Sequence, residues 1–110
     1  MDKDRFSHML AAVSELHRKH DFRGRGGEEM TYRITLMAEE LGEIAACVSK
    51  GKPPSELAEE CADLLILVLG TALSANFDLG RAFWDKMAAL EHRESRLVDG
   101  RVRLFRKGTV

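Results

Sequence analysis

The chain has 110 residues, of which 45% are hydrophobic and 32% charged, and its formal net charge is -1. This length gives room for one domain, and the balanced charge excludes a general attraction to nucleic acid or to an anionic membrane. The N-terminal MDKDRF lacks the apolar run of a signal peptide, and the longest apolar stretch, residues 64–75, is too short to span a bilayer. We therefore expect a single domain over residues 1–110 of a cytoplasmic protein with no membrane partner, and the charge does not favour a nucleic-acid partner.

The first half of the chain predicts two amphipathic helices. Apolar residues recur every three or four positions from Asp4 to Asp21, and three glycines in FRGRGGEE then break the pattern. The same spacing restarts at Met30 and continues to about Lys50. The sequence GKPPS ends this second helix and starts a third, for which Ser55 is a suitable N-cap.

The second half predicts two more helices and a short hairpin. From Cys61 to Ala75 nearly every side chain is apolar, which is typical of a helix surrounded by others. After an interruption at residues 76–78, one apolar stripe runs from Leu79 to Leu97 and predicts a fourth helix. Asp-Gly between alternating apolar residues near the C-terminus favours a two-stranded β-hairpin.

Two acidic hexamers, AEELGE and AEECAD, lie inside these apolar stretches. Each hexamer places three carboxylates on one side of its helix, because positions i, i+1 and i+4 fall within about 100°. The carboxylates are Glu39, Glu40 and Glu43 in the first hexamer and Glu59, Glu60 and Asp63 in the second. A solvated charged face is the ordinary interpretation of such residues. However, no Lys or Arg lies three or four positions away to neutralise them.

Antiparallel helices joined by a short loop would bring the two hexamers together, and the gathered carboxylates then need a cation. Oxygen ligands without His or Cys favour Mg²⁺, with Mn²⁺ as a substitute. A di-iron bundle is excluded, because it needs Glu-x-x-His on two helices and no histidine here has Glu three positions before it. We expect the four histidines on the surface, and Cys47 and Cys61 buried and reduced.

The pattern Glu39-Glu40-x-x-Glu43, sixteen residues and then Glu60-x-x-Asp63 resembles the signature of the MazG-like, all-α nucleoside triphosphate pyrophosphohydrolases. The resemblance covers about residues 30–96 and leaves a basic tail at 97–110. It implies a four-helix bundle-type fold. The other three helices cannot cover a third helix that is apolar on every face, so we expect oligomerisation to complete the bundle, as a homodimer or a dimer of dimers. The resemblance also implies Mg²⁺-dependent cleavage of a ribo- or deoxyribonucleoside triphosphate between the α and β phosphates, an activity suited to nucleotide pool sanitation.

The resemblance also implies roles for individual residues. Glu39 would either orient or deprotonate the attacking water or be a structural carboxylate beside the metal ligands, and Glu59, which has no assigned role in the family, would be solvated surface. The implied metal ligands are Glu40, Glu43, Glu60 and Asp63, the same residues that the helical geometry selects. The implied substrate-binding residues are Asn76 at the start of the fourth helix and Lys86 and Arg93 on one face of it. Arg23 and Arg25 in the glycine-rich loop are further candidates to contact phosphates.

Two alternatives remain open from the sequence. One is a related enzyme that acts on phosphoribosyl-ATP. The other is a non-enzymatic helical interaction module whose acidic face binds a basic partner and whose tail contacts nucleic acid. The tail residues in question are Arg101, Arg103, Arg106 and Lys107.

Overall fold

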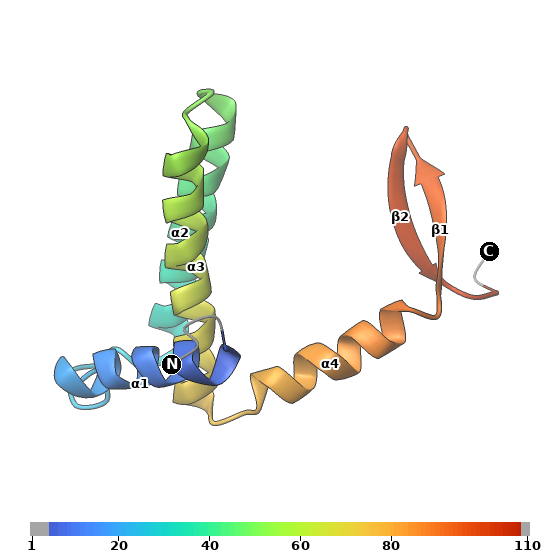
Figure 1. Ribbon diagram of the computed structural model, residues 1–110. Coiled ribbons are helices and arrows are strands. Elements are labelled where there is room, and N and C mark those ends of the chain that lie inside the picture. The colour runs from blue at the N-terminus through green and yellow to red at the C-terminus, as the bar shows by residue number, and fades with distance from the viewer. Residues whose placement is uncertain (1–4, 109–110) are drawn as a thin grey trace. The chain divides into compact units, whose positions relative to one another are not determined.

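The computed structural model describes residues 5–108 and consists of four helices followed by a two-stranded hairpin (Figure 1). The helices are α1 (Phe6–Lys19), α2 (Met30–Ser49), α3 (Pro54–Ala75) and α4 (Leu79–Leu90), and the strands are β1 (Arg93–Val98) and β2 (Arg101–Arg106). The predicted all-α class with a C-terminal hairpin is therefore confirmed. The chain divides into two compact units, one ending at Phe77 and one beginning at Asp78. Among the described residues, no single helix has both the length and the apolar composition of a membrane span.

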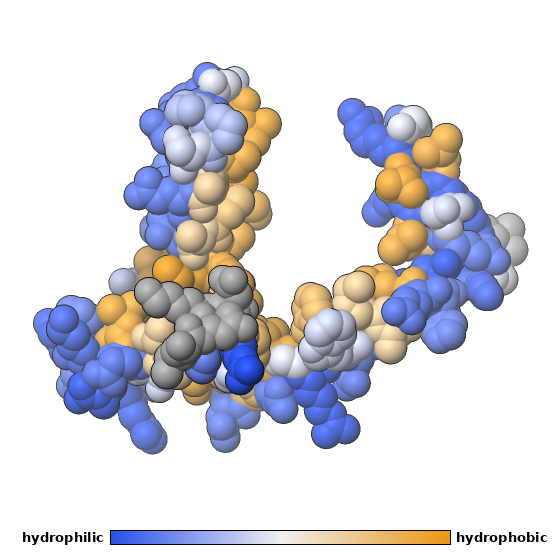
Figure 2. Space-filling model, viewed as in Figure 1, coloured by the Kyte–Doolittle hydropathy of each residue, from blue (hydrophilic) through white to orange (hydrophobic). Residues whose placement is uncertain are grey.

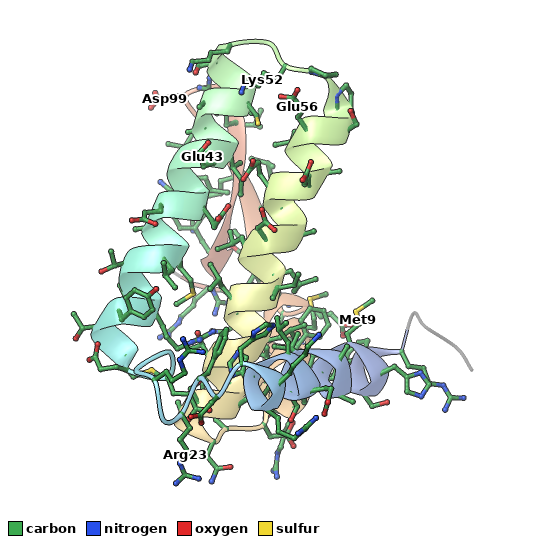
Figure 3. All side chains as sticks on the ribbon, turned by 90° about the vertical axis from the view of Figure 1, so that its left-hand side faces the viewer. Met9, Arg23, Glu43, Lys52, Glu56 and Asp99 are labelled. Carbon is green, nitrogen blue, oxygen red and sulfur yellow. The ribbon has the colours of Figure 1, made fainter. Side chains whose placement is uncertain are left out.

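Helices α2 and α3 form an antiparallel pair joined by a tight turn (Figures 1 and 3). Gly51 adopts φ 63°, and the backbone N–H of Lys52 donates to the carbonyl of Cys47 at 2.9 Å, which closes α2 in a Schellman motif. Helix α3 then starts with Pro54 at its first position, where the missing N–H has no intrahelical partner to lose. The predicted N-cap at Ser55 is therefore wrong, because Pro53 occupies that position.

The start of α2 is capped by Glu29. Its carboxylate accepts hydrogen bonds from the backbone N–H groups of Thr31 at 3.0 Å and Tyr32 at 2.8 Å. These bonds, the one from Tyr32 first, lower the pKa of Glu29 because they stabilise its charged form. The cap fixes where α2 begins, and so fixes which side of the helix its acidic residues occupy.

A buried arginine connects the helices of the first unit. Arg33 of α2 is only 1% exposed, and its guanidinium donates to the Thr71 hydroxyl at 3.1 Å, the Gly27 carbonyl at 2.8 Å and the Leu67 carbonyl at 2.9 Å. The sequence pattern gave no indication of this role. The bonds join α2, α3 and the α1–α2 loop around the small apolar core. The buried core residues are Val13, Cys47, Leu69 and Ala72.

His17 of α1 packs beside this arginine. Its ring is 7% exposed and stacks on Phe22 with centroids 4.3 Å apart, so the prediction that all four histidines lie on the surface is wrong for His17. His17 follows Val13 by four positions and therefore shares the buried face of α1. Gly70 of α3 leaves the space that the imidazole and the Arg33 guanidinium fill.

We expect the chain to lose stability below about pH 6.5 because of His17. Burial is the largest cause that lowers the pKa of His17, followed by the positive charge of Arg33, while Glu28 acts in the opposite direction. The unfolded chain therefore binds a proton at His17 at a higher pH than the folded chain. The contribution of neutral His17 to the free energy of unfolding is fully present above the pKa that His17 has in the unfolded chain. It decreases as the pH falls toward the lower pKa of His17 in the folded chain.

Denaturant unfolding of wild type and His17→Gln at about pH 7 and about pH 5.5 measures this loss. The variant should lose less stability between the two pH values than wild type does. His20→Gln is the control, because His20 is exposed and one turn away, and it should behave as wild type. Equal losses in wild type and His17→Gln would show that His17 does not titrate in this way.

The boundaries around α4 differ from the predicted ones. Asn76 lies at the C-terminal cap of α3 with φ 58° and does not start the fourth helix, which is capped by Asp78. Helix α4 ends at Leu90, so Arg93 and Leu97 belong to β1 and not to a helix. The spacing of seven between Leu90 and Leu97 fits a helix, but the alternating residues beyond it fit a strand, and the strand is what forms.

The C-terminal hairpin follows the Asp-Gly prediction. Asp99 at φ 53° and Gly100 at φ 78° both adopt the left-handed conformation that a two-residue type I′ turn requires. The turn places Val98 opposite Arg101, and the ladder continues to Arg93 opposite Arg106. The register of the two strands is thus set by the turn.

Candidate metal centre

The antiparallel pairing of α2 and α3 brings the two acidic hexamers together. Carboxylate oxygens of Glu40 on α2 and of Glu60 and Asp63 on α3 all lie within 4.8 Å of one another. Glu40 and Glu60 are half-buried, whereas Asp63 is exposed. The expectation that a short loop would place the hexamers opposite each other is met by these three residues.

The remaining acidic residues surround this group without joining it. Glu43 lies one turn further along α2 and is exposed, on the part of the helix nearer the turn, where Lys52 and Glu56 form an ion pair at 3.7 Å (Figure 3). Glu39 and Glu59 are also exposed. The metal-binding role of Glu43 and the catalytic role of Glu39 stay predictions.

Mutual repulsion dominates the electrostatics of the cluster. The pKa of Glu40 is raised, first by a hydrogen bond with Glu60 that requires a proton on one of the two carboxyls, then by burial and by the negative charges of Asp63, Glu60 and Glu43. The inner oxygen of Glu40, Oε2, is buried and has no hydrogen-bond partner among residues 5–108. Such an oxygen is unfavourable unless a proton or a cation satisfies it.

A divalent cation fits this set of residues. No ion pair connects Glu40, Glu60 or Asp63 to a Lys or Arg of the described chain. The ligand atoms are hard carboxylate oxygens with no sulfur or imidazole among them, which suits Mg²⁺ or Mn²⁺ better than zinc. The buried, unpartnered Glu40 oxygen points to the same conclusion.

Comparison with known proteins agrees with this site. The family model of the MazG nucleotide pyrophosphohydrolase domain matches residues 29–98, more than half of the chain. The chain belongs to this family. Members are generally metal-dependent, which accords with the carboxylates between α2 and α3. No curated protein and no solved structure matches the chain.

The MazG match covers α2, α3 and α4 and ends with β1, so β2 lies outside it. Of the residues expected to bind substrate, Asn76 ends α3, Lys86 lies exposed on α4 and Arg93 begins β1. The prediction that Lys86 and Arg93 share one helix face is therefore wrong. Their part in binding substrate stays a prediction.

The two arginines of the glycine-rich loop lie away from the acidic cluster. Arg23 lines a cavity of about 380 Å³ together with His17 and Glu28. Arg25 lines a different cavity of about 350 Å³. Neither cavity is lined by Glu40, Glu60 or Asp63.

The two cysteines of this MazG domain have different surroundings. Cys47 is buried as expected, but Cys61 is exposed, so the prediction that both are buried is wrong for Cys61. Burial raises the pKa of the Cys47 thiol, which keeps it protonated and weakly nucleophilic.

Proposed function

We propose that this protein hydrolyses nucleoside triphosphates, ribo or deoxyribo, between the α and β phosphates in a Mg²⁺-dependent reaction. The products are a nucleoside monophosphate and pyrophosphate. The observation that supports this most strongly is the convergence of three carboxylates, one of them with a buried unpartnered oxygen, between α2 and α3 of a MazG domain. Removing non-standard nucleotides from the cellular pool is a role that suits such an activity.

Glu40, Glu60 and Asp63 would hold the metal, and Glu43 adds a fourth negative charge nearby. Bound Mg²⁺ would offset the charge of the phosphates and lower the pKa of the attacking water. The protein holds these carboxylates in place before substrate arrives, because they project from two helices locked together by Arg33. Such preorganised charge is the main need of phosphoryl transfer.

Glu39 is the candidate proton acceptor. It is exposed and adjacent to Glu40 in the chain, so a carboxylate is available to solvent beside the cluster. Cys47 is a poor candidate for covalent catalysis, since its thiol is buried and its pKa is raised. Direct attack by water is therefore the step that these residues serve best.

A panel of nucleotides with Mg²⁺, scored by released pyrophosphate, tests this function. Purified protein should release pyrophosphate from at least one nucleoside triphosphate and none without a divalent cation. Activity on phosphoribosyl-ATP alone would favour the related enzyme of histidine synthesis. No pyrophosphate from any substrate would favour a binding module and contradict the proposal.

We also expect the hydrolase to be a homo-oligomer, at least a dimer. Ile34, Leu41 and Val48 are spaced by seven along α2, so they share one face, and they are 61%, 60% and 67% exposed. Leu41 lies about 160° around the helix from Glu43 and about 100° from Glu40, so this apolar face is not the one that carries the acidic residues. Figure 2 shows hydrophobic residues gathered along one edge of the α2–α3 pair and hydrophilic residues along the opposite edge.

Light scattering measures this association. Wild type should be a dimer or larger at micromolar concentration, and Leu41→Glu should shift it toward monomer because a charge would enter the apolar contact. Thr35→Glu is the matched control, since Thr35 is an exposed residue on a different side of α2. A folded wild-type monomer, or equal dissociation of both variants, would contradict the expected interface.

A further inference from the structure

The C-terminal hairpin has one face rich in arginine. Residues paired across an antiparallel ladder point to the same side, and so do residues two positions apart in a strand. Arg96 pairs with Arg103, and the next pair toward the turn on that side is Val98 with Arg101. The whole face consists of Glu94, Arg96, Val98, Arg101, Arg103 and Phe105.

This face gathers positive charge that the hairpin itself does not neutralise. Arg96 and Arg103 are directly opposed, an arrangement that is unfavourable without an anion. Arg96 lies 3.8 Å from Glu94, whereas Arg103 has no carboxylate within ion-pair distance among residues 5–108. Residues 93–108 carry six Lys or Arg and two Asp or Glu, a formal charge of +4 that the net charge of -1 for the whole chain conceals.

The arginine face also has an aromatic platform. The guanidinium carbon of Arg96 lies over the Phe105 ring, 4.6 Å from its centre, which is a cation–π contact. Guanidinium planes and aromatic rings are the surfaces on which unpaired bases stack in proteins that bind single-stranded nucleic acid. The arginines beside this contact can form paired hydrogen bonds with phosphate oxygens.

The opposite face of the hairpin is mainly apolar near the turn and carries the pair Arg93 and Arg106 at its open end. Leu97, Val102 and Leu104 are 77%, 67% and 49% exposed and point away from the arginine face. A peripheral membrane segment enters the lipid surface with its apolar side while its cationic side chains flank that side. Here Arg93 and Arg106 flank the apolar side, but the other three arginines, Arg96, Arg101 and Arg103, face the opposite way. Most of the hairpin's arginines would therefore point away from a lipid surface.

We propose that the arginine face of the β1–β2 hairpin binds single-stranded nucleic acid. Arg101 and Arg103 contact phosphates, and the contact of Arg96 with Phe105 supports a base. The two six-residue strands are about 20 Å long, enough to follow a few nucleotides. This binding does not depend on the hydrolase activity, because it uses no residue of the acidic cluster.

Fluorescence anisotropy with the full-length protein tests the proposal. The probe is a labelled single-stranded oligonucleotide of mixed sequence, in chelator to exclude divalent cations. We expect a dissociation constant in the range of about 10⁻⁴ to 10⁻⁶ M that weakens steeply with salt. Arg101→Gln/Arg103→Gln should bind about 25-fold more weakly at about 0.1 M salt. At that salt concentration each lost phosphate contact lowers the logarithm of the binding constant by about 0.7.

Two matched variants separate this effect from general charge and from unfolding. Arg18→Gln/Arg81→Gln removes the same charge from α1 and α4 and should bind as wild type. Arg101→Lys/Arg103→Lys keeps the charge and should retain most of the affinity. The proposal is overturned if the two Gln double variants bind equally, if duplex is bound more tightly than the single strand, or if anionic lipid vesicles are bound and the oligonucleotide is not.

Discussion

Replacing Asp63 with asparagine is expected to lower the rate of nucleotide hydrolysis about 10²-fold or more. The amide keeps the shape of the side chain but removes one of the three negative charges that converge between α2 and α3. Mg²⁺ should raise the melting temperature of wild type because it binds the folded state, and the size of the increase depends on that affinity. Asp63→Asn should bind Mg²⁺ more weakly and lose most of this increase. Pyrophosphate release and thermal melting with and without Mg²⁺ measure the two effects.

Glu59→Gln is the matched control for this prediction. Glu59 precedes Glu60 on α3 and is exposed outside the cluster, so the variant makes the same change of charge four residues from Asp63. Glu59→Gln should keep both the hydrolase activity and the Mg²⁺-dependent increase in melting temperature. If Asp63→Asn kept them as well, or if Glu59→Gln lost them equally, the cluster would not be the metal centre.

Replacing Gly70 with alanine is expected to destabilise the first unit by about 3 kcal/mol. An added Cβ would overlap Nη2 of Arg33 and come within 2.7 Å of Nε2 of His17. Arg33 would then lose its bond to the Leu67 carbonyl and leave part of a buried charge without a partner. Thermal unfolding should show a melting temperature lower by about 10–20 °C.

Gly42→Ala provides the opposite case within α2. Both glycines lie in helix interiors, but a Cβ at Gly42 meets nothing within 4 Å. Alanine there should raise stability by about 0.5–1 kcal/mol through helix propensity alone. A Gly70→Ala variant that melts at or above the temperature of Gly42→Ala would mean that Arg33 and His17 do not fill the space beside α3.

Local patterns in the sequence predicted the helices and the acidic site because both depend on near neighbours in the chain. The spacing of apolar residues identified α2 and α3, and GKPPS identified the turn between them. Once two helices are antiparallel with a short turn, acidic residues at similar distances from that turn come near one another. Glu40, Glu60 and Asp63 converge in this way, whereas Glu43, which is as close to the turn as Glu60, lies outside the group.

Other features depend on contacts between distant residues and could not be predicted from local patterns. Arg33 is buried because it bonds to Thr71, which is 38 positions away, and a helical arginine ordinarily points to solvent. Asn76 adopts a left-handed conformation that ends α3, although asparagine suits either end of a helix. The end of α4 was mispredicted because Leu97 satisfies both a helical spacing and the alternation of β1.

Hydrolysis in water labelled with heavy oxygen tests the proposed function most directly. If water attacks the α phosphate, mass spectrometry should find the label in the nucleoside monophosphate and not in pyrophosphate. The carboxylates of α2 and α3 are proposed to serve that attack, and the buried Cys47 thiol, whose pKa is raised, is a poor covalent nucleophile. Label in pyrophosphate, or release of orthophosphate with a nucleoside diphosphate, would contradict cleavage between the α and β phosphates by this route.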